Sequence, residues 1–269
     1  DAEPGGWAFE FYNELYPDTD DTAEILLFLN RIEIPDSRWK LGECQRAINW
    51  LLSMQSKSGG WGAFDVDNDM EILNEIPFAD HKALLDPPTV DVTSRILWML
   101  SKWGFKPQHP QVQRALNFVK ERQEVDGCWF GRWGVNYIYG TFLALNGLCA
   151  MGEDMNAPFS RKAVRWLESH QNEDGGWGET CQSYAEPSLR GRGQSTASQT
   201  AWALLGLIAA GEVENPAVEH GVHYLIATQK DSGEYSGSWW EDEFTGTGFP
   251  IHFFIKYHMY QHFFPLMAL

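Results

Sequence analysis

The sequence predicts an all-α protein, an α/α toroid (barrel) made of repeated helix hairpins, and three observations lead to this fold class. Two types of segment alternate along the chain, the apolar residues of both have helical spacing, and glycine-rich turns separate them. Helix hairpins that repeat at a near-constant period must stack on one another to bury their apolar faces. We therefore expect a closed or partly closed barrel, with an open helical scaffold as the alternative.

The first type of segment is a helix that leads to a Gln and then to a turn with a Trp. In three copies the Gln and the Trp lie six residues apart, and a looser fourth copy has an insertion between Gln229 and Trp239. Near the N-terminus, residues 5–7 have the form of the end of a fifth copy. We therefore expect a piece of a longer protein, with an incomplete barrel. The regular copies are Gln55/Trp61, Gln123/Trp129 and Gln171/Trp177.

The second type of segment has the pattern T-x-x-x-L-x-x-L, which places leucines four and seven residues after a Thr on one helical face. From each Thr to the next motif Gln are 33, 30, 30 and 29 residues, a spacing that suits a two-helix hairpin. This helix is rich in small and apolar residues, and we expect it to open at the Thr and to form an inner ring. The helix of the first type carries more charge and suits an outer ring. The four threonines are Thr22, Thr93, Thr141 and Thr200.

The charge balance excludes one class of partner. Lys and Arg number 20 and Asp and Glu number 37, so the net charge is −17. Nucleic-acid binders need a basic face, and we expect no nucleic-acid partner. No run of 18 apolar residues occurs, so we expect no bilayer-spanning helix, although an apolar patch could face a membrane. The four cysteines have no C-x-x-C spacing, which indicates thiols in a reducing compartment.

Three carboxyl groups crowd the segment Asp18 to Asp21, immediately before the helix of Thr22. One or two of them would serve as helix N-caps, because acidic side chains stabilise a helix N-terminus. Capping does not require three acids in four residues, which repel one another and titrate as a unit. One of them can then keep a proton at neutral pH, as a general acid must. The sequence thus favours a catalytic acid here over capping alone.

The repeat indicates which side chains would gather around this acid. Asp20, Asp91, Tyr139 and Ser198 each stand two residues before the Thr of their hairpin. If the hairpins superpose, these side chains converge at one end of a central cavity. Long connections lead into the same end of the inner helices, as is typical of the functional face of a repeat fold.

A metal site is the alternative interpretation of the acidic residues. The pattern D-D-x-x-E from Asp20 to Glu24 could hold Mg²⁺, but a hard cation needs a second acidic element opposite the first. Residues 65–69 offer acids, yet an EF-hand there would need Gly at Met70 and Glu at Ile76. We therefore expect no metal and no other cofactor, and a solvated loop at residues 65–69.

Aromatic residues are the second informative set, with 13 Trp and 16 Phe in the chain. They are concentrated in residues 129–139 and in the C-terminal stretch 249–264. Aromatic π faces that line a cavity stabilise a cation without being strong nucleophiles toward it. A proton donor above such a cavity suits protonation of an apolar substrate followed by carbocation chemistry. No nucleophile elbow, dinucleotide loop or Walker loop occurs.

With these motifs the sequence resembles the squalene–hopene cyclases, over essentially all 269 residues and in the C-terminal part of such an enzyme. The Gln–Trp repeats, the D-x-D-D motif at Asp18 to Asp21 and the segments 127–139 and 245–250 carry the resemblance. It implies cyclisation of squalene to hopene and hopanol without a metal or redox cofactor. It also implies a bacterial, monotopic membrane protein on the cytoplasmic side of the cell membrane, and it is compatible with a homodimer.

The resemblance further implies two α-helical barrel domains. Residues 1–269 would supply the catalytic one, and the other would lie upstream, so that this piece alone could fold and yet be inactive.

By this resemblance, Asp20 protonates the terminal alkene of squalene, with support from Asp18 and Asp21. Asp91 and Tyr139 match polar residues of the network that helps to reprotonate the acid. Eight aromatic residues stand where family members place the cavity or its entrance: Phe9, Phe64, Phe78, Trp133, Phe249, Phe253, Tyr257 and Tyr260.

Two positions depart from the pattern of the family. Phe64 stands where a Tyr is known, and Arg95 stands where the best-known member has a His paired with the acid. Arg does not release a proton at ordinary pH, but it can hydrogen-bond a carboxylate. We therefore expect Arg95 to act at the catalytic site while the proton path differs.

Other classes of protein fit less well. Oxidosqualene cyclases have a D-C-T-A-E motif, whereas Asp21 replaces the Cys here; because an alkene is less basic than an epoxide, the extra carboxyl group favours squalene. A class II diterpene cyclase shares D-x-D-D but should lack these repeats. An α/α-barrel glycosidase would need more polar residues beside its acids. A non-catalytic helical-repeat scaffold would leave the acid cluster unexplained.

Overall fold

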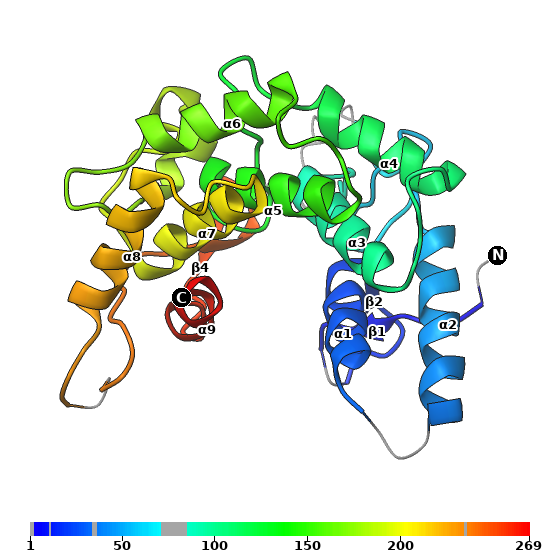
Figure 1. Cartoon of the computed structure of the whole chain (residues 1–269). Helices are drawn as coiled ribbons and strands as arrows, with labels where there is room; N and C mark the ends of the chain where they lie inside the picture. Colours follow the sequence, from blue (N-terminus) through cyan, green and yellow to red (C-terminus); the bar gives the residue numbers. More distant parts are fainter. Residues whose placement is uncertain (1–2, 11, 34–36, 71–84, 234–235) are drawn as a thin grey trace. The chain divides into compact units, whose positions relative to one another are not determined.

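The computed structural model describes residues 3–10, 12–33, 37–70, 85–233 and 236–269 (Figure 1). The described part of the chain is mainly α-helical, as the sequence predicts. Its short strands form two antiparallel pairs, β1 (Trp7–Ala8) with β2 (Pro17–Asp18) and β3 (Gly246–Phe249) with β4 (Phe253–Ile255). The helices are α1 (Thr19–Arg31), α2 (Ser37–Ser53), α3 (Val90–Lys102), α4 (Pro110–Glu121), α5 (Tyr137–Ala150), α6 (Pro158–Ser169), α7 (Ala197–Ala209), α8 (Pro216–Thr228) and α9 (Tyr260–Ala268), with short 3-10 helices η2 (Cys181–Tyr184) and η3 (Pro187–Leu189).

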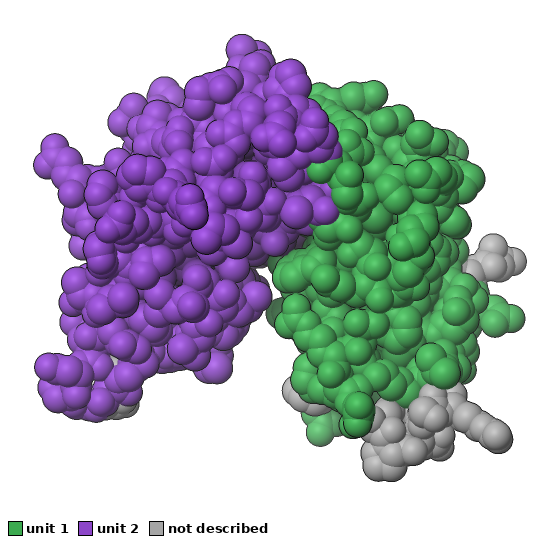
Figure 2. All heavy atoms as spheres, viewed as in Figure 1, with its two compact units in different colours: residues 1–121, 150–153 green, residues 122–149, 154–269 purple. Residues whose placement is uncertain are grey.

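The chain divides into two compact units (Figure 2). The first holds residues 1–121 and 150–153, and the second holds residues 122–149 and 154–269. In the first unit α1 packs against α2 and α3, and α3 packs against α4. In the second unit α7 packs against α6, α8 and α9. That one catalytic domain spans residues 1–269 stays a prediction.

The two predicted kinds of helix differ in burial. Helices α3, α5 and α7 are buried around most of their circumference, whereas α4 and α6 bury one face. A helix that is apolar on all sides must be surrounded by other elements, while an amphipathic helix can face water. Pro110 and Pro158 begin the two amphipathic helices, where a missing backbone N–H costs nothing. The contrast between apolar and charged segments in the sequence is thus a contrast in burial.

The Gln of each regular motif joins its own turn to the beginning of the next charged helix. Nε2 of Gln171 donates to the carbonyl of Gly175 and to that of Ala217 in α8, both at 2.8 Å. Gln55 and Gln123 make the corresponding pairs of bonds, to their own turns and to the beginnings of α4 and α6. The repeat motif is therefore a fastening between successive hairpins.

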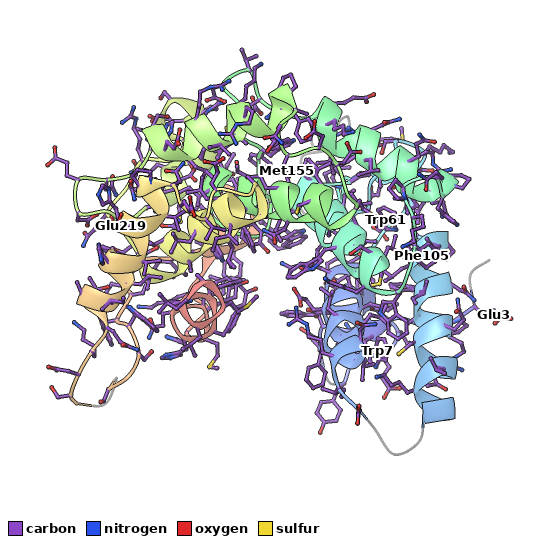
Figure 3. The ribbon with its side chains drawn as sticks, in the orientation of Figure 1. Glu3, Trp7, Trp61, Phe105, Met155 and Glu219 are labelled. Carbon is purple, nitrogen blue, oxygen red and sulfur yellow. The ribbon has the colours of Figure 1, made fainter. Side chains whose placement is uncertain are left out.

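The Thr of each second segment does not open its helix, contrary to the expectation, because each helix begins three or four residues earlier. Instead, the Thr side chain binds the turn before its helix, and the hydroxyl of Thr200 accepts the backbone N–H of Trp177 at 2.9 Å. The same bond joins Trp7 to Thr22 at 2.9 Å, which confirms residues 5–7 as the end of a fifth copy (Trp7 and Trp61 are labelled in Figure 3). Two further pairs are joined at 3.0 Å, Trp61 with Thr93 and Trp129 with Thr141.

The C-terminal aromatic stretch forms the β3–β4 pair and then α9. Phe249 lies opposite Phe253 in the strand pair. Ile251 between them has a φ of 75°, a left-handed backbone conformation that a β-branched residue rarely adopts. Among the described residues, no helix combines the length and the apolar character needed to cross a bilayer.

Candidate active site

The acid cluster lies at the N-terminus of α1, and Asp18 caps that helix. Its Oδ1 accepts the backbone N–H of Asp20 at 2.6 Å and that of Asp21 at 3.0 Å. The Asp18 side chain is buried, whereas a quarter of the Asp20 side chain is exposed (25%). Asp18 therefore caps the helix, and part of the Asp20 side chain remains accessible to solvent.

A second buried carboxylate, which the sequence analysis missed, fixes the backbone of the cluster. Thr19 donates its N–H to the carbonyl of Ala63 at 2.8 Å and its hydroxyl to the carbonyl of Gly62 at 2.7 Å. That loop is itself held by Asp86, whose carboxylate accepts the backbone N–H groups of residues 63–65 at 2.6–3.1 Å. The position of the acids thus depends on residues far away in the sequence.

Arg95 on α3 contacts the cluster, as predicted. Its Nε lies 2.7 Å from Oδ1 of Asp20, and its Nη1 pairs with the carboxylate of Glu24. Asp91 precedes Arg95 by one helical turn and is 1% exposed, with Oδ1 accepting the N–H of Val92 at 3.1 Å. The structure therefore brings Arg95 of α3 to Asp20 of α1, whose backbone N–H is held by Asp18, while Asp91 lies one turn before Arg95 on α3.

The environment of the cluster favours a bound proton. Burial, together with the negative charges of Asp20 and Asp21, raises the pKa of Asp18 to about 8. Burial and the charge of Asp20 also raise the pKa of Asp21, while Arg95 opposes this shift. Adjacent carboxyl groups that interact this strongly share their protons. At neutral pH the cluster can hold a proton, as the sequence predicts.

Asp18→Asn should make the stability of the complete enzyme less dependent on pH. The pKa of Asp18 in the fold, about 8, lies above its ordinary value of 3.8, so raising the pH between these values weakens the wild-type fold. Asn has no proton to lose and still caps the helix. The melting temperature of the variant relative to wild type should therefore rise from pH 4 to pH 8. A difference that stays constant over this range would contradict the assignment.

The second unit contains an aromatic cluster centred on Trp202 of α7, which the sequence analysis missed. Its ring centroid lies 4.8 Å from that of Tyr139, 5.8 Å from that of Tyr260 and 5.3 Å from that of Phe264. Tyr257 stacks on Tyr260 with centroids 4.7 Å apart. Three of the predicted site residues are therefore packed together in this unit.

The loop before α5 joins Trp133 to the C-terminal strands. The N–H of Thr247 in β3 donates to the carbonyl of Trp133 at 3.0 Å, and β3 continues to Phe249, opposite Phe253. The positions of Trp133, Phe249 and Phe253 are therefore set by this loop and the β3–β4 strand pair.

Tyr184 fastens this loop, although nothing in the sequence distinguishes it from the other tyrosines. Its hydroxyl lies 3.0, 3.1 and 2.8 Å from the carbonyls of Gly131, Arg132 and Gly134. A hydroxyl has one proton to donate, so it serves one carbonyl at a time. Tyr184 thus holds the segment around Trp133 in place.

Helices α5 and α7 each begin against a buried glutamate that stands two residues after a motif Trp. Oε2 of Glu179 accepts the N–H of Ile138 at 3.0 Å, and Oε2 of Glu241 accepts the N–H of Ser198 at 2.9 Å. Burial raises the pKa of both carboxyl groups. These glutamates fix the helix ends that carry Tyr139 and Ser198.

The remaining predicted aromatic residues lie in the first unit or outside the described residues. Phe9 is 60% exposed, and Phe64 is half-buried with its ring centroid 5.2 Å from that of Tyr16. Phe78 lies outside the described residues. The substrate-binding roles of all eight aromatic residues stay predictions.

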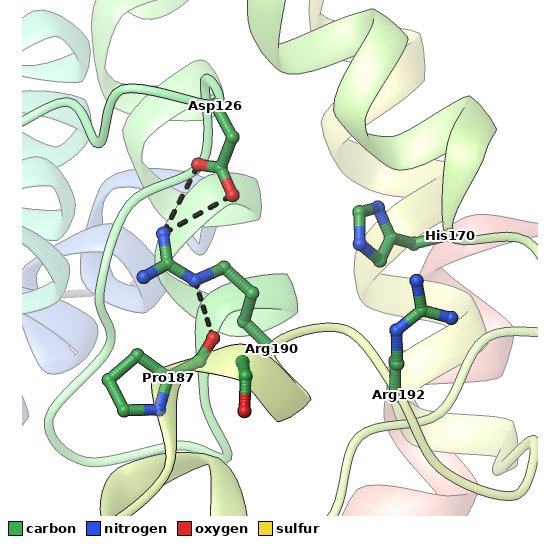
Figure 4. Close-up of a pocket in the computed structure, with 6 residues that line it drawn as sticks. Asp126, His170, Pro187, Arg190 and Arg192 are labelled. Atoms are coloured by element: carbon green, nitrogen blue, oxygen red, sulfur yellow. Dashed lines mark hydrogen bonds and ion pairs between the residues drawn. The ribbon is translucent and has the colours of Figure 1, made fainter.

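The second unit also contains a polar pocket (Figure 4). Arg190 in its wall has Nη1 3.2 Å from Oδ2 of Asp126 and donates Nε–H to the carbonyl of Pro187 at 2.8 Å. Its charge is therefore already compensated. The lining residues are Asp126, His170, Pro187, Ser188, Arg190 and Arg192.

The family model of the squalene–hopene cyclase C-terminal domain matches residues 1–269. The chain belongs to the squalene–hopene cyclase family. The squalene–hopene cyclase of Zymomonas mobilis is 48% identical over 100% of this chain and 41% of its own length. That of Alicyclobacillus acidocaldarius is 47% identical over 99% and 42%, and the dammaradiene synthase of Dryopteris crassirhizoma is 45% identical over 97% and 41%. The chain thus spans about two fifths of the length of these relatives.

Solved structures agree with this family at the level of the fold. A type II terpene cyclase, MstE from Scytonema, superposes with a TM-score of 0.63 at 20% identity, over 93% of this chain and 65% of its own. The ent-copalyl diphosphate synthase of Streptomyces platensis gives 0.60 at 18% identity, over 94% and 41%. The fold class predicted from the repeats, an α/α barrel of helix hairpins, is confirmed.

Proposed function

We propose that the complete protein cyclises squalene to hopene and hopanol, and that Asp20 starts the reaction. The observation that carries the proposal is the acid cluster of α1, in which a proton is favoured and Arg95 Nε lies 2.7 Å from Oδ1 of Asp20. Membership of the squalene–hopene cyclase family supports the choice of substrate.

Protonated Asp20 donates its proton to the less substituted carbon of a terminal double bond of squalene. The π electrons form the new C–H bond, the electron pair of the O–H bond stays on the carboxylate, and the other alkene carbon becomes a tertiary cation. Each following double bond attacks the cation formed before it, and aromatic faces stabilise these cations. Loss of a proton from the last cation gives hopene; addition of water and loss of a proton gives hopanol. No metal or redox cofactor enters this scheme.

Arg95 supports the first step by stabilising the Asp20 carboxylate that remains after proton transfer. Once Asp20 has lost its proton, its carboxylate lies beside a guanidinium, and a charge-assisted contact of this kind stabilises the anion. Stabilising the anion makes the protonated form a stronger acid. Asp18 and Asp21 are the adjacent carboxyl groups from which Asp20 can regain a proton.

The choice between squalene and its epoxide is tested by offering both to the complete enzyme. We expect faster consumption of squalene and products without a hydroxyl on the first ring, because Asp21 stands where oxidosqualene cyclases have Cys. Faster conversion of the epoxide would support the oxidosqualene cyclase alternative. Gas chromatography of the extracted products measures both rates.

We also propose that the complete enzyme works as a peripheral, monotopic protein at the cytoplasmic face of the cell membrane. Squalene is a hydrocarbon that partitions into lipid, and exposed apolar side chains such as Phe253 and Leu266 would tolerate a lipid environment. A homodimer stays a prediction, which sedimentation of the complete protein in detergent tests.

A further inference from the structure

Arg95 is shared between two carboxylates of α1. Nε pairs with Asp20 at 2.7 Å, and Nη1 pairs with Glu24, one helical turn further along the same face. The Arg95 side chain is only 9% exposed, while that of Glu24 is 47% exposed. The buried guanidinium therefore bridges two carboxylates, Asp20 on one side and the half-exposed Glu24 on the other.

We propose that Glu24 is a positioning residue that holds Arg95 and divides its charge, so that Asp20 can be protonated again after each turnover. The inference rests on the proposed function, in which Asp20 must alternate between its acid and its carboxylate. When Asp20 is neutral, the ion pair with Glu24 still holds the guanidinium. When Asp20 is ionised, Glu24 withdraws part of the positive charge that would otherwise keep it ionised.

The charged side chains on the elements that carry this ion pair come from β2, α1 and α3. The end of β2 and the start of α1 supply Asp18, Asp20 and Asp21, α1 also supplies Glu24, and α3 supplies Asp91 and Arg95. Helix α2 packs against α1, and α4 packs against α3. Among the described residues, the ion pairs found on α2 and α4 do not include the acids or Arg95. Those pairs are Arg46 with Glu43 and Lys120 with Glu153.

The positions of these charges predict how loss of the Glu24 charge changes the pKa of the acid cluster. Arg95 already lowers the pKa of Asp21 against the burial that raises it. Removing the charge of Glu24 removes an anion from the neighbourhood and leaves the whole guanidinium charge to the Asp cluster. Both changes favour the ionised cluster, so the proton should leave at a lower pH.

Glu24→Gln in the complete enzyme tests the proposal, with Glu43→Gln as the control because Glu43 also pairs with an Arg on the same unit. The infrared band of protonated carboxyl groups, followed against pH without substrate, should lose intensity at a pH lower by roughly 0.5–1 unit in Glu24→Gln. The upper pH limit of squalene turnover should move by the same amount. Glu43→Gln should match wild type in both measurements.

The role of Arg95 is isolated by repeating Glu24→Gln in an Arg95→Gln background, or in Arg95→Lys if Arg95→Gln does not fold. The shift should shrink to less than half, because the shared group is gone. An unshifted Glu24→Gln, or an equal shift in both backgrounds, would overturn the proposal. If wild type does not cyclise squalene, the proposed function fails, while the infrared titration still decides the role of Glu24.

Discussion

Asp20→Asn in the complete enzyme should abolish squalene turnover while leaving the fold intact. The amide keeps the shape of the side chain and its place beside Nε of Arg95, but it has no acidic proton to give to an alkene. The loss should exceed the roughly 10²–10⁴-fold typical of general-acid catalysis, because no other group starts the reaction. Product formation by gas chromatography and the melting temperature are the two measurements.

The control is the same change at an exposed acid, Asp231→Asn, which should keep wild-type turnover. If Asp20→Asn retained most of the activity, the acid would have to be Asp18 or Asp21, or the mechanism would be wrong.

Glu179→Ala should be the most destabilising of the changes considered. Glu179 is 3% exposed, and its Oε2 accepts the N–H groups of Ile138 and Asn136 at the beginning of α5. Alanine leaves both buried donors without an acceptor, and the expected cost is about 2–5 kcal/mol of unfolding free energy. Turnover should fall as well, because α5 carries Tyr139. Denaturant unfolding of the complete enzyme measures the first effect.

Two variants separate this cause from a general effect of losing a glutamate. Glu179→Gln keeps the volume and one acceptor oxygen, so it should cost much less than Glu179→Ala. Glu214→Ala removes an exposed glutamate of the same unit and should change stability by less than about 0.5 kcal/mol. Equal losses for Glu179→Ala and Glu179→Gln would show that the hydrogen bonds to α5 are not the cause.

Much of the fold could be predicted because the repeat is visible in one sequence. The alternation of segments, the helical spacing of leucines and the Gln–Trp spacing depend on neighbouring residues alone. The role of the Thr could not be predicted in this way. The hydroxyl of Thr93, for example, accepts the N–H of Trp61, a bond across 32 residues that no local pattern encodes.

In the candidate site, too, features set by neighbouring residues could be predicted, and features set by tertiary contacts could not. Asp18, Asp20 and Asp21 are crowded in the sequence itself, so their shared proton could be expected. Glu24 stands in the sequence beside them, but its role depends on Arg95 from another helix. Asp86 supports the cluster only through a loop of backbone groups. Contacts of this kind are set by packing, and a single sequence carries no signal for them.

The N-terminus of α1 differs from those of α5 and α7 in the group that binds its backbone. In α5 and α7 the N–H of the second helical residue is accepted by a glutamate two residues after a motif Trp. In α1 the equivalent position after Trp61 is Ala63, and the N–H of Asp20 is accepted by Asp18 instead. Asp18 thus takes the role at α1 that a buried glutamate has at α5 and α7.

The most direct test of the central claim is to let the complete enzyme convert squalene in D₂O and to locate the deuterium in the product by NMR. Protonation of the terminal alkene by the acid cluster predicts one deuterium on the ring carbon next to the gem-dimethyl carbon of the first ring. Asp20→Asn should give no labelled product. Cyclised squalene without deuterium at that carbon would contradict the account, because the reaction would then have begun in another way.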